Sequence, residues 1–190
     1  LGYLSRGADI VVLAGSLPRD VPAEYYAVLA QKLARPDLRI VVDAPGSALR
    51  EALLAEPWLV SPNTREAEDV VGNEDAAAGA AMLCHMGAGN ALVHDERGCV
   101  ASLTGDGGTR TLLARVDAMT EVVSTVGSGD AFLAGYLAGV YVGASEEDAL
   151  REAVACGAAS TQLLGAGVLA PGDVEAIARQ VTVHEVAAGA

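Results

Sequence analysis

The segment Gly127–Asp130 places two glycines and an acid where a helix is expected to begin, within the stretch S-T-V-G-S-G-D-A-F at 124–132. Two valines precede this stretch, and an almost wholly apolar run follows it up to Val142. The first turn of a helix has unpaired N–H groups and a partial positive charge, and glycine lets a ligand oxygen approach the backbone closely. We therefore expect Gly127, Ser128 and Gly129 to form a hole for an anion.

Asp130 adds a carboxylate beside this hole. Like charges repel, so a carboxylate is poorly explained as a phosphate ligand and makes better sense as a base. An acid that accepts a proton from a hydroxyl, next to N–H groups that stabilise a transferring phosphoryl group, meets the two main needs of a kinase. An alternative stays open, because glycine turns before helices are common and the helix dipole alone favours an acid in the first turn.

The elements that must position this turn alternate along the first part of the chain. Expected strands at 10–14, 39–42 and 58–60 are separated by expected helices at 22–33 and 49–55. Repeated strand–helix–strand units form right-handed crossovers, so we expect an α/β fold with a mostly parallel sheet and helices on its faces.

The pattern changes after further helical stretches at 63–71 and around 75–86. Three short β-like runs at 91–93, 99–103 and 109–116 predict an antiparallel meander at the edge of the sheet. The remainder is expected to be helical, in the segments 130–142, 145–164 and 171–180.

Length and composition narrow the class of protein. The 190 residues suit a single domain with one core. No apolar run is long enough to span a bilayer and no leader is recognised, so we expect a soluble, cytoplasmic protein without a membrane partner. A net charge of -13 with Lys32 as the only lysine argues against nucleic acid as a ligand. Three widely spaced cysteines form neither a disulfide framework nor a metal site, which fits a reducing compartment.

The stretch S-T-V-G-S-G-D-A-F-L-A-G resembles the D-T-x-G-A-G-D signature of the phosphofructokinase B family of ribokinase-like carbohydrate kinases. Ser124 stands where that family usually has Asp, and Ser128 stands where Ala is common. By position, the resemblance implies that Asp130 is the catalytic base and that residues 127–129 hold the transferred phosphate. It also implies a three-layer α/β/α sandwich.

The sequence S-P-N-T-R-E at 61–66 directly follows an expected strand. From spacing alone, Asn63 and Glu66 form a capping box at the start of a helix. The family has an N-x-x-E motif at this point, tied to Mg²⁺ and to the triphosphate. The resemblance therefore implies that both residues serve ATP, with Glu66 reaching Mg²⁺ through water, and both roles stay open.

Gly15–Pro18, with the sequence G-S-L-P, is by itself an ordinary turn at the end of a strand. The same four residues resemble the branch of the family that phosphorylates sugar phosphates, such as 1-phosphofructokinases and tagatose-6-phosphate kinases. The resemblance implies that Ser16 donates a hydrogen bond to the phosphate already on the sugar, because the carboxyl ends of parallel strands face the ligand crevice.

The segment V-H-D-E-R-G at 93–98 departs from the family, which usually shows T-x-G-x-x-G here. Only Gly98 is kept, and it remains an expected nucleotide contact. His94–Glu96 is expected to be an exposed hairpin turn rather than a catalytic cluster. Gly157 is the remaining candidate, because the helix that carries it borders the adenine in relatives.

The matched motifs cover nearly the whole chain but only the later part of a family member, and the chain begins at Leu1 rather than Met. The N-terminal strands and the β lid of the family are not among its residues. Upstream residues, a partner that supplies the cover, or loss of catalysis would each explain this.

Two functions are therefore expected. The first is an ATP- and Mg²⁺-dependent kinase that transfers the γ-phosphoryl group to a hydroxyl of a phosphorylated ketose resembling fructose 1-phosphate, with a homodimer as a further expectation. The second is a truncated, non-catalytic remnant that binds nucleotide or protein.

Overall fold

A computed structural model of the chain describes residues 2, 4–105, 107–116 and 122–187. They form two compact units. The N-terminal unit holds the chain up to Val93 together with Ala101–Thr111. The C-terminal unit holds His94–Val100 and Leu112–Val186.

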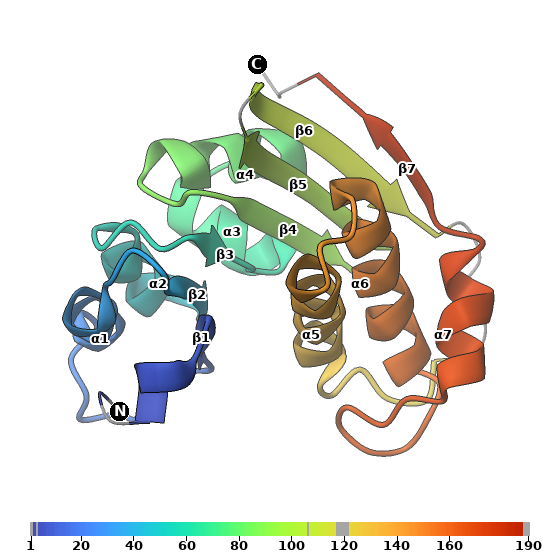
Figure 1. The fold of residues 1–190 in the computed structure, drawn as a ribbon, viewed down its shortest axis with the longest axis horizontal. Helices are drawn as coiled ribbons and strands as arrows, with labels where there is room; N and C mark the ends of the chain where they lie inside the picture. Colours follow the sequence, from blue (N-terminus) through green and yellow to red (C-terminus); the bar gives the residue numbers. More distant parts are fainter. Residues whose placement is uncertain (1, 3, 106, 117–121, 188–190) are drawn as a thin grey trace. The chain divides into compact units, whose positions relative to one another are not determined.

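Parallel strands and helices alternate in the N-terminal unit (Figure 1). After a 3-10 turn at Leu4–Gly7, the elements are β1 (Ile10–Ala14), α1 (Tyr25–Leu33), β2 (Arg39–Asp43), α2 (Gly46–Leu53), β3 (Leu59–Val60), α3 (Thr64–Val71) and α4 (Ala76–His85). Strand β1 pairs with β2 in parallel, with Ile10 opposite Arg39, and β2 pairs with β3 in the same way. This alternation confirms the crossover pattern expected from the sequence.

Strand β2 shows why the parallel part of the sheet has an apolar sequence. Ile40, Val41 and Val42 are consecutive and all buried. A strand reads as a continuous apolar run when both of its faces are covered, as parallel strands between layers of helices are. The β-branched residues of β2 therefore determine both its extended backbone and its interior position.

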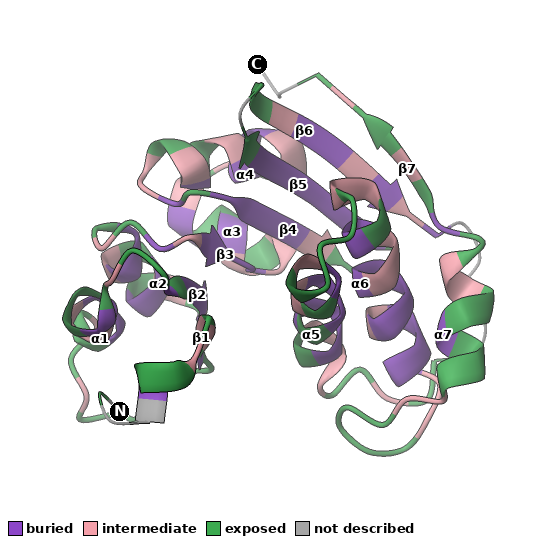
Figure 2. Ribbon diagram, viewed as in Figure 1, coloured by how far each residue is buried: buried purple, intermediate pink, exposed green. Residues whose placement is uncertain are grey.

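The later strands are β4 (Ala91–Asp95), β5 (Gly98–Gly105), β6 (Gly108–Arg115) and β7 (Thr182–Glu185), and the seven strands follow chain order in the sheet. Strand β4 still pairs in parallel with β3, through Val60 and Ala91. Only two residues join β4 to β5, which requires an antiparallel pair, and β6 and β7 are antiparallel as well. The α/β class is confirmed, and Figure 2 shows that β4 and β5 are mostly buried.

Strand β7 corrects the expectation that the remainder of the chain is helical. Its sequence T-V-H-E is short and mostly polar, and three of its four residues are exposed. Such a segment becomes a strand because β6 offers an open edge, with Leu113 opposite His184. That pairing joins distant parts of the chain, so no local pattern predicts it.

The C-terminal unit contains α5 (Ser128–Tyr141), α6 (Glu146–Ser160) and α7 (Pro171–Ala178). Helix α6 ends four residues before the expected boundary at Leu164. Helices α5 and α6 lie side by side (Figure 1), and glycines on α5 allow the close approach. A Cβ at Gly139 would lie only 2.8 Å from the Cα of Ala149.

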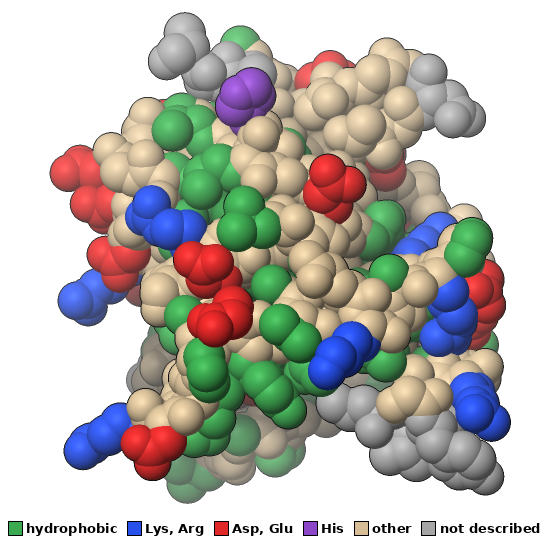
Figure 3. Space-filling view, turned by 90° about the vertical axis from the view of Figure 1, so that its left-hand side faces the viewer, with side chains coloured by type: hydrophobic (Ala, Val, Ile, Leu, Met, Phe, Trp, Pro, Cys, Tyr) green, Lys and Arg blue, Asp and Glu red, His purple; other side chains and the backbone are tan. Residues whose placement is uncertain are grey.

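The surface is mixed in character. On the face shown in Figure 3, hydrophobic side chains lie among acidic and basic ones, and the basic side chains do not merge into one continuous surface. Among the described residues, no helix combines the length and the apolar character needed to cross a bilayer.

Candidate active site

A tight turn leads into helix α5. The N–H of Ser128 donates to the carbonyl oxygen of Thr125 at 3.2 Å, which closes a four-residue turn. Gly127 occupies its third position with φ 81° and ψ 6°, the backbone angles of a type II turn. Only glycine adopts these angles readily, so the turn itself explains this glycine.

The first turn of α5 keeps several N–H groups available. Within the described part of the chain, the N–H groups of Gly127, Gly129 and Asp130 donate to no other residue, and the first helical bond runs from Ala131 to Gly127. The N–H of Ser128 is used by the turn, and its hydroxyl donates to the same Thr125 carbonyl at 2.9 Å. Of the three N–H groups that the described residues leave unused, those of Gly129 and Asp130 belong to α5 itself and are supported by its dipole, and that of Gly127 directly precedes the helix.

Asp130 is exposed in the first turn of α5. Its carboxylate accepts no hydrogen bond and forms no ion pair with any residue that the structure describes. A first-turn acid that served only as a cap would commonly bond to a backbone N–H of its own helix. The geometry therefore leaves this carboxylate accessible to a proton donor from outside the chain.

Two neighbours in the C-terminal unit flank this turn. The imidazole of His94, at the end of β4, lies 3.4 Å through its Cε1 from where a Cβ of Gly129 would be. Gly157 on α6 lies on another side, where a Cβ would be 3.1 Å from the Cβ of Phe132 and 3.4 Å from the carbonyl oxygen of Ser128. Gly157 thus lets α6 approach the start of α5, which gives it a packing role whether or not it borders a nucleotide.

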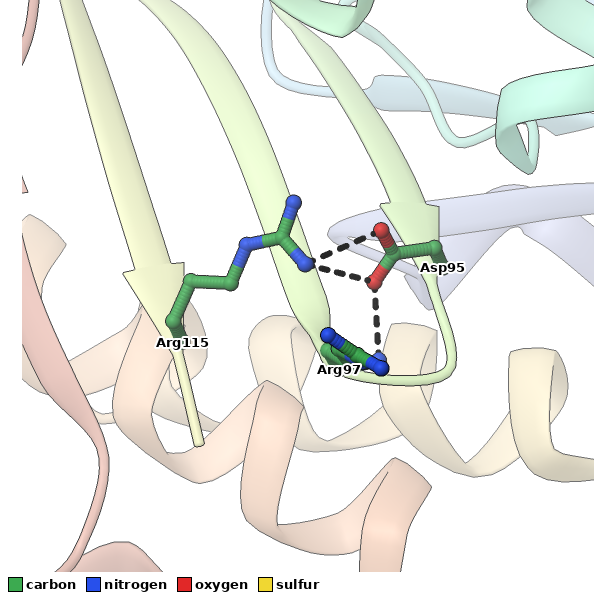
Figure 4. A network of polar contacts seen from close by, with 3 residues as sticks. All are labelled: Asp95, Arg97 and Arg115. Atoms are coloured by element: carbon green, nitrogen blue, oxygen red, sulfur yellow. Dashed lines mark hydrogen bonds and ion pairs between the residues drawn. The ribbon is translucent and has the colours of Figure 1, made fainter. Parts of the chain in front are cut away.

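The β4–β5 turn is held by ionic contacts (Figure 4). Asp95 accepts from the N–H of Arg97 at 2.8 Å and pairs with Arg115 of β6 at 3.1 Å.

Gly98, the first residue of β5, has φ 153°, and a Cβ there would overlap the carbonyl oxygen of Ala114. The close passage of β6 therefore accounts for Gly98. Asp95 and Glu96 are exposed as expected, whereas His94 is half-buried against α5.

Asn63 and Glu66 belong to the N-terminal unit, at the start of α3. Both halves of the capping box are present: Asn63 Oδ1 accepts from the N–H of Glu66, and Glu66 Oε2 accepts from the N–H of Asn63. The capping role is confirmed. One oxygen of Glu66, Oε1, takes no part in the cap.

Ser16 follows β1 in the N-terminal unit and is exposed. The N–H of Gly15 donates to the carbonyl oxygen of Asp43 at 2.8 Å. Gly15 has φ 90°, and the chain turns at this residue. The hydroxyl of Tyr26 donates to the carbonyl oxygens of Ala14 and Gly15, at 2.8 and 3.0 Å. Burial raises the pKa of this phenol, and the Asp43 carboxylate raises it further, so Tyr26 stays a hydrogen-bond donor that fixes the start of the loop.

Comparison with known proteins identifies the protein family of this chain. Residues 4–172 match the model of the pfkB family carbohydrate kinases. The chain is a member of the pfkB family. This confirms the resemblance carried by the turn at the start of α5.

Named relatives within the pfkB family phosphorylate sugar phosphates, by their descriptions. A 1-phosphofructokinase of Haemophilus influenzae is 36% identical over 167 residues, which cover 84% of this chain and 52% of that protein. A D-tagatose-1-phosphate kinase of Bacillus licheniformis is 31% identical over 90% of this chain and 57% of that protein. The chain thus spans about half the length of the relatives it matches.

Solved structures confirm the ribokinase-like α/β fold. Phosphofructokinase-2 of Escherichia coli, in complex with substrates and products, matches 90% of this chain with a TM-score of 0.78 and 27% identity, and the match covers 56% of that protein. A ribokinase of Arabidopsis thaliana, with ribose and ATP, matches 94% of this chain and 58% of its own with a TM-score of 0.72 and 22% identity, a likeness of fold alone.

The pfkB motifs of this chain are divided between its two units. Residues 127–130, Gly98 and Gly157 lie in the C-terminal unit, and Ser16, Asn63 and Glu66 lie in the N-terminal unit. Sequence reasoning missed two side chains that touch these motifs, His94 and Tyr26. No local sequence pattern indicates either contact. His94 contacts Phe132 of α5, which is distant in the sequence. The spacing of Tyr26 indicates only an apolar position of α1, whereas its hydroxyl donates to Ala14.

Proposed function

We propose that the protein is an ATP-dependent sugar-phosphate kinase that transfers the γ-phosphoryl group to a hydroxyl of a phosphorylated ketose such as fructose 1-phosphate. One observation carries the proposal: the exposed carboxylate of Asp130 lies in the same helical turn as the N–H groups of Gly129 and Asp130, which donate to none of the residues that the structure describes. Membership of the pfkB family supports phosphoryl transfer to an alcohol.

In this reaction, Asp130 accepts the proton of the acceptor hydroxyl as its oxygen attacks the γ-phosphorus of ATP. The bond between the γ-phosphorus and the bridging oxygen breaks, and ADP leaves. Negative charge on the transferring group is stabilised by the N–H groups of Gly127 and Gly129, together with that of Asp130, and by the positive end of the α5 dipole. The N–H of Ser128, also expected in this anion hole, donates to Thr125 instead. Ser16 holds the phosphate already on the sugar.

Mg²⁺ would neutralise charge on the triphosphate when bound with ATP. Asn63 and Glu66 fit this ion through water, since the capping box fixes both side chains and leaves Glu66 Oε1 outside the cap. Among the described residues, no group of three His, Cys, Asp or Glu side chains is placed to hold a metal directly. Gly98 and Gly157 are proposed to border the nucleotide. A cytoplasmic single domain that forms a homodimer completes the proposal.

A non-catalytic remnant that binds nucleotide or protein is the second candidate. It is favoured by the altered segment 93–98, which lacks the T-x-G pattern of the family. It predicts nucleotide or protein binding without turnover.

Release of ADP from MgATP and fructose 1-phosphate, followed by a coupled assay, separates the two candidates. If Asp130 is the base, Asp130→Asn lowers turnover by about 100- to 10,000-fold without weakening MgATP binding. Asp173→Asn is the matched control, because Asp173 is also an exposed acid in the first turn of a helix, α7. Equal turnover in the wild type and Asp130→Asn would remove Asp130 from this role, and MgATP binding without any turnover would support the remnant.

A further inference from the structure

The hydroxyl of Tyr26 contacts two consecutive carbonyl groups at the end of β1. It lies 2.8 Å from the carbonyl oxygen of Ala14 and 3.0 Å from that of Gly15. Tyr26 belongs to α1 and its side chain is buried. A phenol has a single O–H, so this donor is shared between two acceptors of the backbone.

This double contact depends on the backbone of Gly15. Consecutive carbonyl groups of a strand point to opposite sides, so one hydroxyl does not reach both while the chain stays extended. Gly15 has φ 90°, which ends the extended backbone and which glycine adopts readily. Its N–H donates to the carbonyl oxygen of Asp43 in β2 at 2.8 Å. Gly15 is therefore held through its N–H by β2 and through its carbonyl group by α1.

The contact with Tyr26 also sets the direction of Ser16. The C=O and N–H of one trans peptide unit point in opposite directions, so a Gly15 carbonyl held by Tyr26 directs the N–H of Ser16 away from the phenol. Ser16 is exposed, and neither its N–H nor its hydroxyl bonds to any other residue that the structure describes. The loop thus offers two unused donors on a residue whose orientation depends on Tyr26.

We propose that Tyr26 is a positioning residue for the phosphate already on the sugar: it holds the Gly15–Ser16 peptide so that Ser16 donates to that phosphate. This role rests on the proposed kinase function, in which Ser16 binds the sugar phosphate. Tyr26 acts through the backbone and does not touch the substrate. Donors that are fixed in advance bind more tightly, because less conformational freedom is lost on binding. Tyr26 therefore affects affinity for the sugar phosphate and leaves affinity for ATP unchanged.

The first test compares the wild type with Tyr26→Phe, which keeps the buried ring and removes only the hydroxyl. Dissociation constants are measured by calorimetry for fructose 1-phosphate and for MgATP. We expect a loss of about fivefold or more for fructose 1-phosphate and none for MgATP. In turnover, KM for fructose 1-phosphate should rise by a similar factor while kcat changes by less than about twofold.

Tyr25→Phe is the matched control for this variant. Tyr25 is the preceding residue of α1, is 43% exposed and bonds to no other residue that the structure describes. This control should bind both ligands as the wild type does. Unchanged affinity of Tyr26→Phe for fructose 1-phosphate would overturn the inference, as would an equal loss for MgATP, since that loss reports a general disturbance of the fold.

A double-mutant cycle tests whether Tyr26 acts through Ser16. Ser16→Ala removes the hydroxyl that is proposed to bind the phosphate. Combining it with Tyr26→Phe should weaken binding of fructose 1-phosphate by less than the product of the two single losses, because both changes affect one contact. Single losses that simply multiply would contradict the inference, because Tyr26 would then support a different contact.

Gly15→Ala disturbs the same peptide without changing Tyr26, and it provides a reading if Tyr26→Phe fails to fold by thermal unfolding. A Cβ at Gly15 meets nothing within 4 Å, so the change acts through backbone strain alone. We expect weaker binding of fructose 1-phosphate and unchanged binding of MgATP. Gly72→Ala is the control, because Gly72 has φ 73° and an equally open Cβ position. Equal affinity of Gly15→Ala and Gly72→Ala for fructose 1-phosphate would count against the proposed orientation of Ser16.

Failure of the wild-type chain to bind fructose 1-phosphate would overturn the inference as well. The kinase function is judged separately, by turnover in the wild type and in Asp130→Asn. Selective loss of fructose 1-phosphate binding in Tyr26→Phe, in a chain without turnover, would support the role of Tyr26 and reject the kinase function. Turnover with unchanged binding in Tyr26→Phe would do the reverse.

Discussion

Asn63 and Glu66 hold each other in place at the start of α3: the N–H of Glu66 donates to Asn63 Oδ1 at 2.9 Å, and the N–H of Asn63 donates to Glu66 Oε2 at 3.0 Å. A stability role and a proposed nucleotide role therefore fall on the same two side chains. Substitutions that keep the hydrogen bonds but change the charge separate these roles.

Glu66→Gln should keep the cap and weaken the proposed Mg²⁺ contact. Glutamine serves in capping boxes as glutamate does, so the free energy of unfolding should change by less than about 0.5 kcal/mol. Because the charge that attracts the hydrated ion is lost, we expect affinity for ATP in the presence of Mg²⁺ to fall about 10-fold or more. Urea unfolding and calorimetry check the two expectations.

Two controls belong to this prediction. Glu68→Gln removes the same charge from an exposed position of α3 and should leave MgATP binding unchanged. Asn63→Ala removes the cap and should cost about 1 kcal/mol of stability. If Glu66→Gln bound MgATP as tightly as the wild type, Glu66 would have only its capping role.

Gly127→Ala should destabilise the protein through both backbone strain and contact. The type II turn requires a positive φ, which costs an alanine about 1–2 kcal/mol. A new Cβ would also lie 3.0 Å from the Cβ of Ala166 and from the N atom of Gly167. Gly143→Ala is the control, because Gly143 has φ 73° but nothing within 4 Å of its Cβ position. Thermal or urea unfolding should show the larger loss for Gly127→Ala, and equal losses would mean that the contact with 166–167 contributes nothing.

Gly139→Ala tests the close packing of α5 on α6. Alanine favours a helix by about 1 kcal/mol over glycine. A Cβ here would nevertheless lie 2.8 Å from the Cα and 2.9 Å from the Cβ of Ala149, so the helices must separate. We expect a net loss of about 1–3 kcal/mol, the usual cost of overpacking. Gly172→Ala on α7, where a Cβ meets open space, should be neutral or stabilising. A stabilised Gly139→Ala would show that α5 and α6 separate at little cost.

The parts of the fold that sequence reasoning predicted are those with local signals. Strand β2 is apolar along most of its length, the Asn63–Glu66 spacing specifies a cap, and the glycines before Asp130 specify a turn. In each case neighbouring residues determine the structure. The same holds for the α/β class, because alternating strands and helices leave few other arrangements.

The features of the fold that the sequence did not predict depend mostly on residues that are distant in the chain. Strand β7 exists through its pairing with β6, and its own sequence lacks a clear apolar alternation. His94 was interpreted as part of an exposed turn, yet Phe132 and Gly129 bury one side of its ring. The use of the Ser128 N–H by Thr125 was not predicted either, because turn type depends on backbone angles that Gly-x-Gly leaves open.

Asn90 should be important for stability in the N-terminal unit. Its side chain is 8% exposed, donates to the carbonyl oxygen of Trp58 and accepts from the N–H of Thr104, each at 2.9 Å. Asn90→Ala would leave two backbone groups without partners, at a cost of about 1–3 kcal/mol each. Asn73→Ala is the control, since Asn73 makes one exposed bond to the N–H of Asp75. Urea unfolding should show a clearly larger loss for Asn90→Ala, and similar losses would indicate that water replaces the Asn90 bonds.

Cys99 should make stability depend on pH in alkaline solution. Burial, together with the nearby Asp95 carboxylate, raises the pKa of its thiol from an ordinary 9.0 to about 12. The unfolded chain loses this proton above pH 9 while the folded chain keeps it, so the contribution of Cys99 is full below pH 9 and is lost as the pH rises toward 12. The free energy of unfolding should therefore fall with pH more steeply in the wild type than in Cys99→Ala, by at most about 1.4 kcal/mol per pH unit. Urea unfolding between pH 8 and pH 10.5, at about half-unit steps, compares the two slopes rather than the two stabilities, so the small cavity left by alanine does not affect the result. Parallel curves for the two proteins would show that the thiol ionises as readily in the folded chain as in the unfolded one.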